Sequence, residues 1–274
     1  MPPEPDAYFT RTGPHTFQPT SHTGGAWSES EQHVSPLGGL IVHEIQAHAA
    51  AREGQAQRSD SLAISRLSLD ILGVLPVDEF DIHVQVIRPG RTIELLEATV
   101  TATGRPAICA RAWRLATADT KHVSGGEDAA LPSPQAVQRW PLTSVWPGGY
   151  IASLDVRPTT QPEPGRATAW VHTPLQLLED EPSSDLARFV ALVDTANGIA
   201  VRRSPREWMF PNVDLTVHLH RQPEGDWVGL DTTVVFGPAG HGLTSTVLHD
   251  SLGPVGRAEQ SLTIRPIHPP SVQR

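Results

Sequence analysis

The feature of this sequence that most constrains its fold is an internal repeat. Three pairs of similar positions have nearly the same separation, about 148 residues: Gly38 and Leu186, Phe80 and Trp227, and Gly104 and Gly253. The first pair lies at the start of two apolar segments with helical spacing, the second in two strand-like segments, and the third in two hairpins. Self-similarity at a fixed separation indicates that the chain contains two copies of one structural unit.

Each copy shows the same order of elements. An early strand precedes one mostly apolar helix, and three or four long antiparallel strands follow. This order suits an antiparallel sheet curled around a single helix, so the predicted fold class is α+β. We expect one domain at residues 1–115 and a second at 139–274. Residues 116–138 are rich in Gly, Ser, Pro, Asp and Ala and lack a hydrophobic period, so they are the predicted linker.

Composition excludes several other classes of protein. The net charge is −9 and no run of Lys and Arg is present, which argues against nucleic acid as a partner. No segment approaches the ~20 apolar residues of a membrane span, and no apolar leader is visible, so we expect a cytoplasmic protein away from the membrane. Cys109 is the only cysteine, and His218 and His220 lack further clustered ligands. We therefore expect neither a metal centre nor a cofactor.

Four short segments make the fold prediction more specific than the order of elements does. They are HVSPLGGL at 33–40, VIRPGR at 86–91, GDWVGLD at 225–231 and GRAEQSL at 256–262. In order and spacing they resemble the thioesterase-like double hot-dog proteins of the acyl-CoA thioesterase superfamily. The resemblance extends over nearly the whole chain outside the linker and the termini. It implies a double hot-dog fold, with two antiparallel sheets each wrapped around a central helix.

The resemblance also implies a chemistry. Proteins of this kind cleave an acyl thioester, carried by CoA or by a carrier protein, with a water held between an Asp, a Ser or Thr hydroxyl and a Gln. Asp214 and Gln260 match the first and last of these positions. The hydroxyl position falls at or next to Val234, which has no hydroxyl. Thr232 and Thr233 are the nearest substitutes.

Strand parity gives independent support for Gln260. Side chains alternate between the two faces of a strand, so Gln260 shares a face with the apolar Ala258 and Leu262. Thr232 is likewise the polar member of an apolar stripe. Each of these polar groups needs a partner in the protein, water or substrate, and nearby backbone would serve as well as a ligand. Asp214 lies on the polar side of its strand, where a catalytic role as general base requires the other half's helix nearby.

Three further residues are candidates for substrate contacts. Gly38 and Gly39 precede an apolar helix, where free backbone N–H groups could stabilise an oxyanion, although glycines also permit close helix packing. Asp194 lies in the second predicted helix, either as an alternative acid-base group or on a solvated face.

The substitution of the family hydroxyl leaves other functions open. With Val234 at that position, the site suits a repurposed dehydratase, isomerase or cyclase of a biosynthetic pathway, or an acyl-binding protein without catalytic activity. The fold alone does not choose among them. Fused hot-dog pairs leave surfaces that commonly associate, so a homo-oligomer is compatible with the sequence.

Overall fold

The structure is a computed structural model of the 274-residue chain, of which it describes residues 4–28, 30–56 and 62–267. The first half contains β1 (Ala7–Arg11), β2 (Thr16–Pro19), α1 (Val34–Ala56), β3 (Leu62–Ile71), β4 (Phe80–Arg88), β5 (Ile93–Ala102) and β6 (Arg105–Ala116). The order of one helix followed by four antiparallel strands is the one predicted from the repeat. Helix α1 begins four residues before Gly38.

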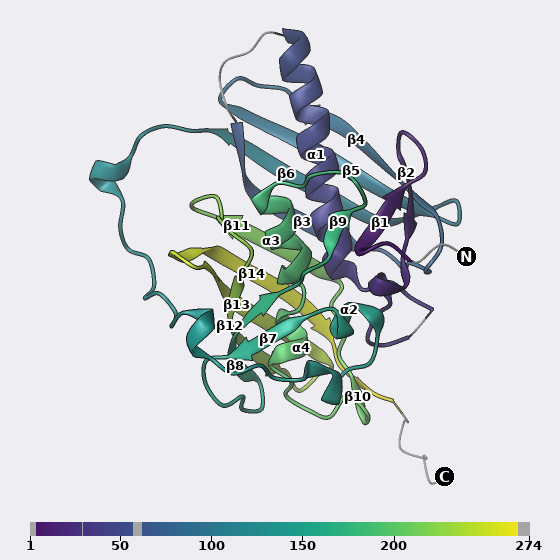
Figure 1. The fold of residues 1–274 in the computed structure, drawn as a ribbon, viewed down its shortest axis with the longest axis vertical. Helices are drawn as coiled ribbons and strands as arrows, with labels where there is room; N and C mark the ends of the chain where they lie inside the picture. Colours follow the sequence, from purple (N-terminus) through teal and green to yellow (C-terminus); the bar gives the residue numbers. More distant parts are fainter. Residues whose placement is uncertain (1–3, 29, 57–61, 268–274) are drawn as a thin grey trace.

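The second half repeats this order. Its first elements are α2 (Gly149–Ala152), β7 (Asp155–Pro158), β8 (Arg166–His172), β9 (Gln176–Leu178), α3 (Asp185–Val193) and α4 (Ala196–Ile199). The strands that follow are β10 (Trp208–Met209), β11 (Asp214–Leu219), β12 (Val228–Phe236), β13 (His241–Asp250), β14 (Gly253–Thr263) and β15 (Arg265–Pro266). Between the halves, residues 117–138 contain two short 3₁₀ turns, Lys121–Val123 and Pro134–Ala136. The first turn stands out from the body of the molecule in Figure 1, whereas the second packs on the second half, where Pro134 is buried.

The two halves join edge to edge in one sheet. Among the described residues this sheet has 13 strands in the order β7-β8-β12-β13-β14-β11-β3-β6-β5-β4-β2-β1-β9. Antiparallel β3 and β11 meet at the junction, where Ser68 pairs with Thr216. These two residues are also 148 positions apart, which is the period of the repeat. The junction therefore lies on an approximate twofold axis that relates the two units, and it pairs two strand edges that would otherwise be exposed.

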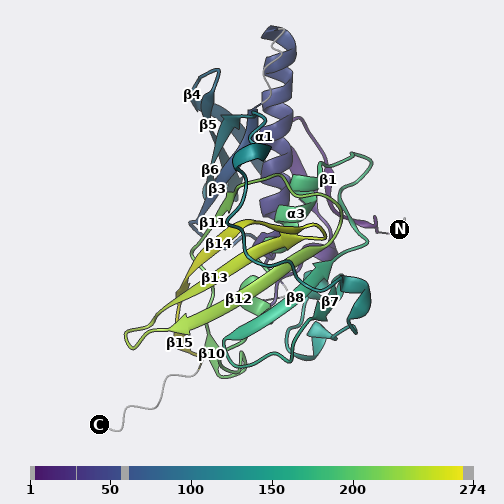
Figure 2. The same ribbon diagram turned by 90° about the vertical axis from the view of Figure 1, so that its left-hand side faces the viewer.

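The helices lie on the two parts of this sheet. Helix α1 packs on β4 and β5, and α3 and α4 pack on β12. Figure 1 shows α1 against the upper part of the sheet and α3 against the lower part, and Figure 2 shows how strongly the strands of the lower part are inclined. The α+β double hot-dog fold expected from the sequence is confirmed. No helix in the described part of the chain is both long and apolar enough to cross a membrane.

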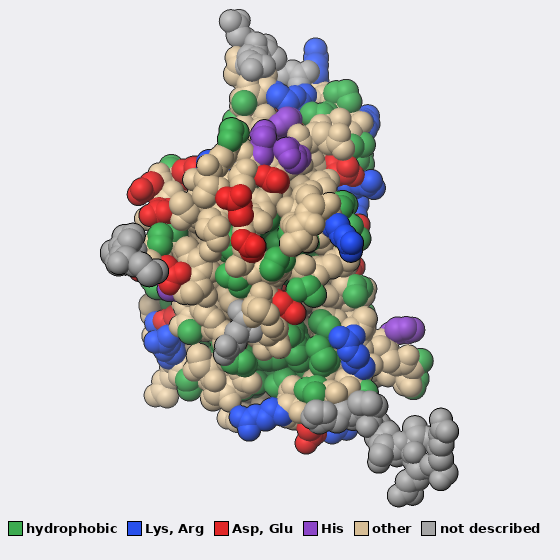
Figure 3. Space-filling model, turned by 90° about the vertical axis from the view of Figure 1, so that its right-hand side faces the viewer, with side chains coloured by type: hydrophobic (Ala, Val, Ile, Leu, Met, Phe, Trp, Pro, Cys, Tyr) green, Lys and Arg blue, Asp and Glu red, His purple; other side chains and the backbone are tan. Residues whose placement is uncertain are grey.

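The first half of α1 is apolar on nearly all sides because it is covered on nearly all sides. Leu40, Ile41, Val42 and Ile45 point in different directions around the helix, yet all four are fully buried. One side faces the sheet and the other faces α3, which is the helix in closest contact with it. On the outer surface, Figure 3 shows hydrophobic side chains gathered in the lower half of the face that carries β1, β2 and α2.

The contact between α1 and α3 is antiparallel and close. At one end Gln46 of α1 bonds Ser184, just before α3, and at the other end His33 lies beside Asp194. Midway, a Cβ atom added to Gly39 would lie 2.5 Å from the carbonyl oxygen of Ala187. Gly39 is thus a helix-packing residue.

The close packing predicts a contrast between two adjacent glycines. Gly39→Ala should lower the free energy of unfolding by about 1–3 kcal/mol, because the helices must separate to admit the methyl group. Gly38→Ala is the matched control, since its added Cβ would meet Val190 at an ordinary 3.4 Å. That variant should be neutral or gain up to about 1 kcal/mol from helix propensity. Urea unfolding measures both, and equal stabilities would contradict the packing role of Gly39.

Candidate active site

The site is centred on the carboxyl group of Asp194. This residue directly follows α3 as its C-terminal cap and is only 6% exposed. Its Oδ1 accepts hydrogen bonds from the side-chain amides of Gln260, in the middle of β14, and of Asn212, just before β11. Both N–O distances are 2.7 Å. One carboxylate oxygen is therefore held by two amides, while Oδ2 is directed elsewhere.

Burial changes the acidity of this carboxyl group. It raises the pKa of Asp194 to about 7, although the hydrogen bonds from Asn212 and Gln260 favour the charged form and act in the opposite direction. A carboxyl with a pKa near neutrality exists in both protonation states under physiological conditions. It is therefore suited to accept and return a proton during a reaction.

A histidine faces the second carboxylate oxygen. His33 Nδ1 lies 3.8 Å from Asp194 Oδ2, and the same nitrogen accepts the backbone N–H of Ser35 at 3.1 Å. Burial lowers the pKa of His33 to about 4, so the ring is neutral at pH 7 and carries its proton on Nε2. The contact with Asp194 is consequently a pair of acceptors rather than an ion pair. The imidazole is packed against the ring of Tyr150, with centroids 4.3 Å apart.

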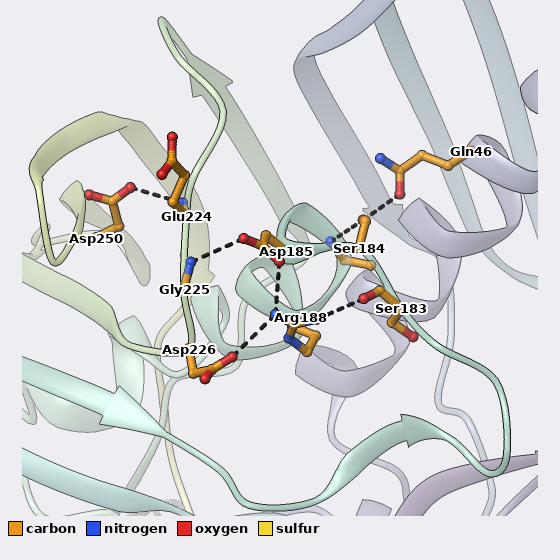
Figure 4. A network of polar contacts seen from close by, with 10 residues as sticks. Gln46, Ser183, Ser184, Asp185, Arg188, Glu224, Gly225, Asp226 and Asp250 are labelled. Atoms are coloured by element: carbon orange, nitrogen blue, oxygen red, sulfur yellow. Dashed lines mark hydrogen bonds and ion pairs between the residues drawn. The ribbon is translucent and has the colours of Figure 1, made fainter.

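Polar contacts at the N-terminal end of α3 hold this helix in place and so position Asp194 at its other end. Ser184 caps the helix by accepting the N–H of Ala187, and its hydroxyl donates to Gln46 of α1 at 2.6 Å. Asp185 accepts the backbone N–H of Gly225, and Arg188 bridges Asp185 to the β11–β12 loop (Figure 4). The helix is therefore tied both to the first half and to the strands that carry the rest of the site.

Asp194, Asn212 and His33 line a surface cleft of about 280 Å³. The walls come from both halves: the end of β3 with the segment after it (residues 71–75), the loop at 25–28, and the start of α1 on one side, with Pro211 and Asn212 on the other. A second cavity of about 40 Å³ continues inward from the same three residues. The site thus lies at the junction of the two units, and neither unit forms it alone.

The structure brings together only two of the residues expected at the site, Asp194 and Gln260. Thr232 is fully buried on the inner face of β12, where its hydroxyl lies 3.1 Å from that of Thr246. Thr233 points to the opposite, exposed face. Val234 is buried on the same side as Thr232. None of these three lines the cleft or the inner cavity.

The structure also places Asp214 and the two glycines apart from the cleft. The Asp214 carboxylate is on the partly exposed side of β11, as strand parity indicates, and accepts the backbone N–H of Ser261 at 2.6 Å. Gly38 and Gly39 are the fifth and sixth residues of α1, beyond the first turn whose N–H groups lack helical acceptors. The close contact of Gly39 with α3 accounts for that glycine, whereas a Cβ at Gly38 would make only an ordinary contact with Val190.

Sequence reasoning missed Asn212 and His33. Asn212 uses both amide hydrogens, one on Asp194 and one on the backbone oxygen of Asp214 at 3.0 Å, so only its Oδ1 remains for the cleft. It lies outside regular strand pairing, where parity gives no signal. His33 is contained in the segment that supported the family resemblance, and its place immediately before the helix was the available signal. Within the described ranges, no group of three or more His, Cys, Asp or Glu side chains is arranged to hold a metal ion.

Comparison with known proteins identifies the family of this chain. A family model described as the acyl-CoA thioesterase N-terminal domain matches residues 23–115, and the model of the C-terminal domain of the same enzymes matches residues 128–264. No curated protein matches the sequence.

Solved structures agree in fold over the whole chain. A putative thioesterase II from Thermobifida fusca is 18% identical, with 97% of this chain and 99% of that one covered and a TM-score of 0.66. A hot-dog protein of unknown function from Alicyclobacillus acidocaldarius is 14% identical, with 96% and 97% covered and a TM-score of 0.71. The acyl-CoA thioesterase II TesB2 of Mycobacterium marinum is 15% identical, with 98% of both chains covered and a TM-score of 0.64. The chain belongs to the acyl-CoA thioesterase family, with an N-terminal and a C-terminal hot-dog domain.

Proposed function

We propose that this protein hydrolyses an acyl thioester of CoA or of a carrier protein, with Asp194 as the general base. The observation that carries the proposal is the buried carboxyl of Asp194, held by the amides of Gln260 and Asn212 at the inner end of a cleft. Family membership supports the same reaction class. In this proposal Asp194 takes the role that the family resemblance implied for Asp214.

The acceptors around the cleft define a place for the attacking water. A water beside Asp194 donates one hydrogen to Oδ2. His33 Nδ1, 3.8 Å from that oxygen, does not accept the other, because its single lone pair already accepts the backbone N–H of Ser35. Asn212 Oδ1 is the acceptor for the second hydrogen of the water, because both hydrogens of that amide are already used and Asn212 lines the cleft. A water whose hydrogens point to these acceptors presents its lone pair to the substrate, which is the orientation that nucleophilic attack requires.

The reaction follows from this arrangement. Asp194 Oδ2 takes a proton from the water as its oxygen bonds to the thioester carbonyl carbon. The tetrahedral intermediate then expels the thiolate as the C–S bond breaks, and Asp194 returns the proton to the sulfur. We place the carbonyl oxygen near Val34, which lines the cleft and opens α1, where a backbone N–H has no helical acceptor. The products are a carboxylic acid and a free thiol.

Replacing the base separates its catalytic role from its effect on stability. Asp194→Asn should reduce turnover by about a hundred- to ten-thousandfold, the usual contribution of a general base. The pKa of Asp194 is about 4 in the unfolded chain and about 7 in the folded protein, because the folded state disfavours the charged form. The parent therefore loses stability as the pH rises from about 4 to about 7. The variant lacks this loss. Its advantage in unfolding free energy should therefore grow between pH 5 and pH 8, by on the order of a few kcal/mol.

Thiol release from a panel of acyl-CoAs and urea unfolding at the two pH values provide these measurements. Full turnover in a folded Asp194→Asn protein would exclude Asp194 as the base. A stability difference that is independent of pH would contradict the raised pKa.

The pH dependence of turnover gives a second check. The parent should become more active as pH rises, with an apparent pKa near 7 for Asp194, since only the ionised carboxyl accepts a proton. Because Gln260 donates to that carboxyl, Gln260→Leu should move the rising limb to higher pH. Initial rates of thiol release measured from about pH 5 to 9 show the limb. A profile that is flat over this range in the parent would contradict the assignment.

Replacement of Gln260 and of Asp214 distinguishes the two candidate general bases, Asp194 and Asp214. Gln260→Leu should fold at least as well as the parent at about pH 5, where Asp194 is protonated and a leucine suits the apolar face, while turnover falls by roughly ten- to a thousandfold. Asp214→Asn is the matched control, since its carboxylate bonds the backbone outside the cleft, and it should retain turnover within about twofold. An equally large loss in both variants, with both folded, would return Asp214 to the mechanism.

A further inference from the structure

Three cavities meet at the loop that precedes α1. Ala26 and Trp27 line the open cleft of about 280 Å³, the inner pocket of about 40 Å³, and a third cavity of about 490 Å³ on the far side. Trp146 lines the inner pocket and the third cavity but not the open cleft. The two indoles therefore stand between the site of Asp194 and a larger space beyond it.

The position of the base decides which part of a thioester occupies each space. The thiol side of the substrate continues into CoA or a carrier protein and must reach solvent. The open cleft provides that route, since its rim includes the exposed Leu72 and Val74. The acyl side must then extend from Asp194 into the inner pocket. Asn197 on its wall is buried and donates to the backbone oxygen of Phe210, while its Oδ1 has no partner among the described residues. The pocket thus has a free acceptor for a bound group.

The inner pocket is short and its end is rigid. A buried water needs about 10–15 Å³ of such space, so a pocket of about 40 Å³ has room for roughly three water-sized groups, or an acyl chain of about two to four carbons. Trp146 is held by a hydrogen bond from its Nε1 to the backbone oxygen of Gly198 at 2.9 Å. Trp27 meets the rings of Trp146 and Phe210 edge to face, with centroids 4.9 and 5.2 Å apart. Interlocked aromatic side chains of this kind do not move aside at small cost.

We propose that Trp27 is the residue that limits acyl length, and that this protein acts on short-chain acyl thioesters. The inference rests on the proposed function for the position of the scissile bond. Removal of the Trp27 indole joins the inner pocket to the third cavity, whose wall includes the side chains of Val145, Pro147 and Met209. A longer acyl chain then contacts apolar surface that Trp27 blocks in the parent.

Binding of non-hydrolysable thioethers tests this without any turnover. We would titrate the full chain with S-ethyl-, S-butyl-, S-hexyl- and S-octyl-CoA by calorimetry. The parent should bind the butyl compound at least about tenfold more tightly than the octyl one, and Trp27→Ala should tighten octyl binding by about tenfold or more. The kcat/KM values for the matching acyl-CoAs should shift in the same direction. Trp27→Phe, which keeps an aromatic ring, should give an intermediate order and covers the case in which the alanine variant does not fold.

Trp227→Ala is the control, because that indole packs on His172 and Arg157 and lines none of the three cavities. It should leave the chain-length order of the parent unchanged. The proposal is overturned if the parent prefers the octyl compound, if no thioether binds, or if neither Trp27 variant changes the order. Length-dependent binding without hydrolysis of any acyl-CoA would instead overturn the proposed function and leave the role of Trp27 in place.

Discussion

The close antiparallel contact between α1 and α3 is the constraint on which the rest of the structure depends. Gly39 allows the helices to approach until the position of its missing Cβ lies 2.6 Å from the Cβ of Ala191. This approach brings the residue before α1, His33, to the residue after α3, Asp194. It also sets the distance between the two helix layers and so permits β3 and β11 to pair as one continuous sheet. A site that needs both units is a direct result of this packing.

The same packing accounts for the unusual acidity of Asp194. A carboxylate withdrawn from water is unstable unless other groups replace the lost hydration. Here two amides supply hydrogen bonds to one oxygen, and no cation within the described residues pairs with the other; the nearest ring nitrogen belongs to a neutral imidazole. Partial compensation leaves the pKa near neutrality, between that of a solvated carboxyl and that of an isolated buried one. A stronger partner such as Arg would have kept the residue ionised and weakened it as a base.

The fold could be predicted from the sequence because a repeat is tested by several independent pairs of positions. Corresponding positions in helix, strand and hairpin had to agree in one separation, and the strand register across the junction has the same value. Parity was similarly reliable for Gln260, since alternation along a long strand fixes the face of each side chain. It also placed Asp214 on the polar side of β11, which the structure bears out. The family resemblance implied the catalytic role for Asp214, whereas we propose it for Asp194, because only contacts between distant segments distinguish the two aspartates.

The third member of the site could not be found by searching for a hydroxyl. The pattern implied by the family led from Trp227 to Val234 and its neighbours, all on β12, whereas the residue beside Asp194 and Gln260 is Asn212 in the loop before β11. A hydroxyl has one hydrogen and can rotate to donate either to a carboxylate or to water. The Asn212 amide has its two hydrogens fixed on Asp194 and on the backbone, and it turns an acceptor toward the cleft. The water in such a site is oriented entirely by acceptors, so its attack depends on the ionisation of Asp194 alone rather than on the rotation of a hydroxyl. In the mechanism that we propose, an amide at this position is therefore compatible with hydrolysis, and the rate follows the charge on one carboxyl group.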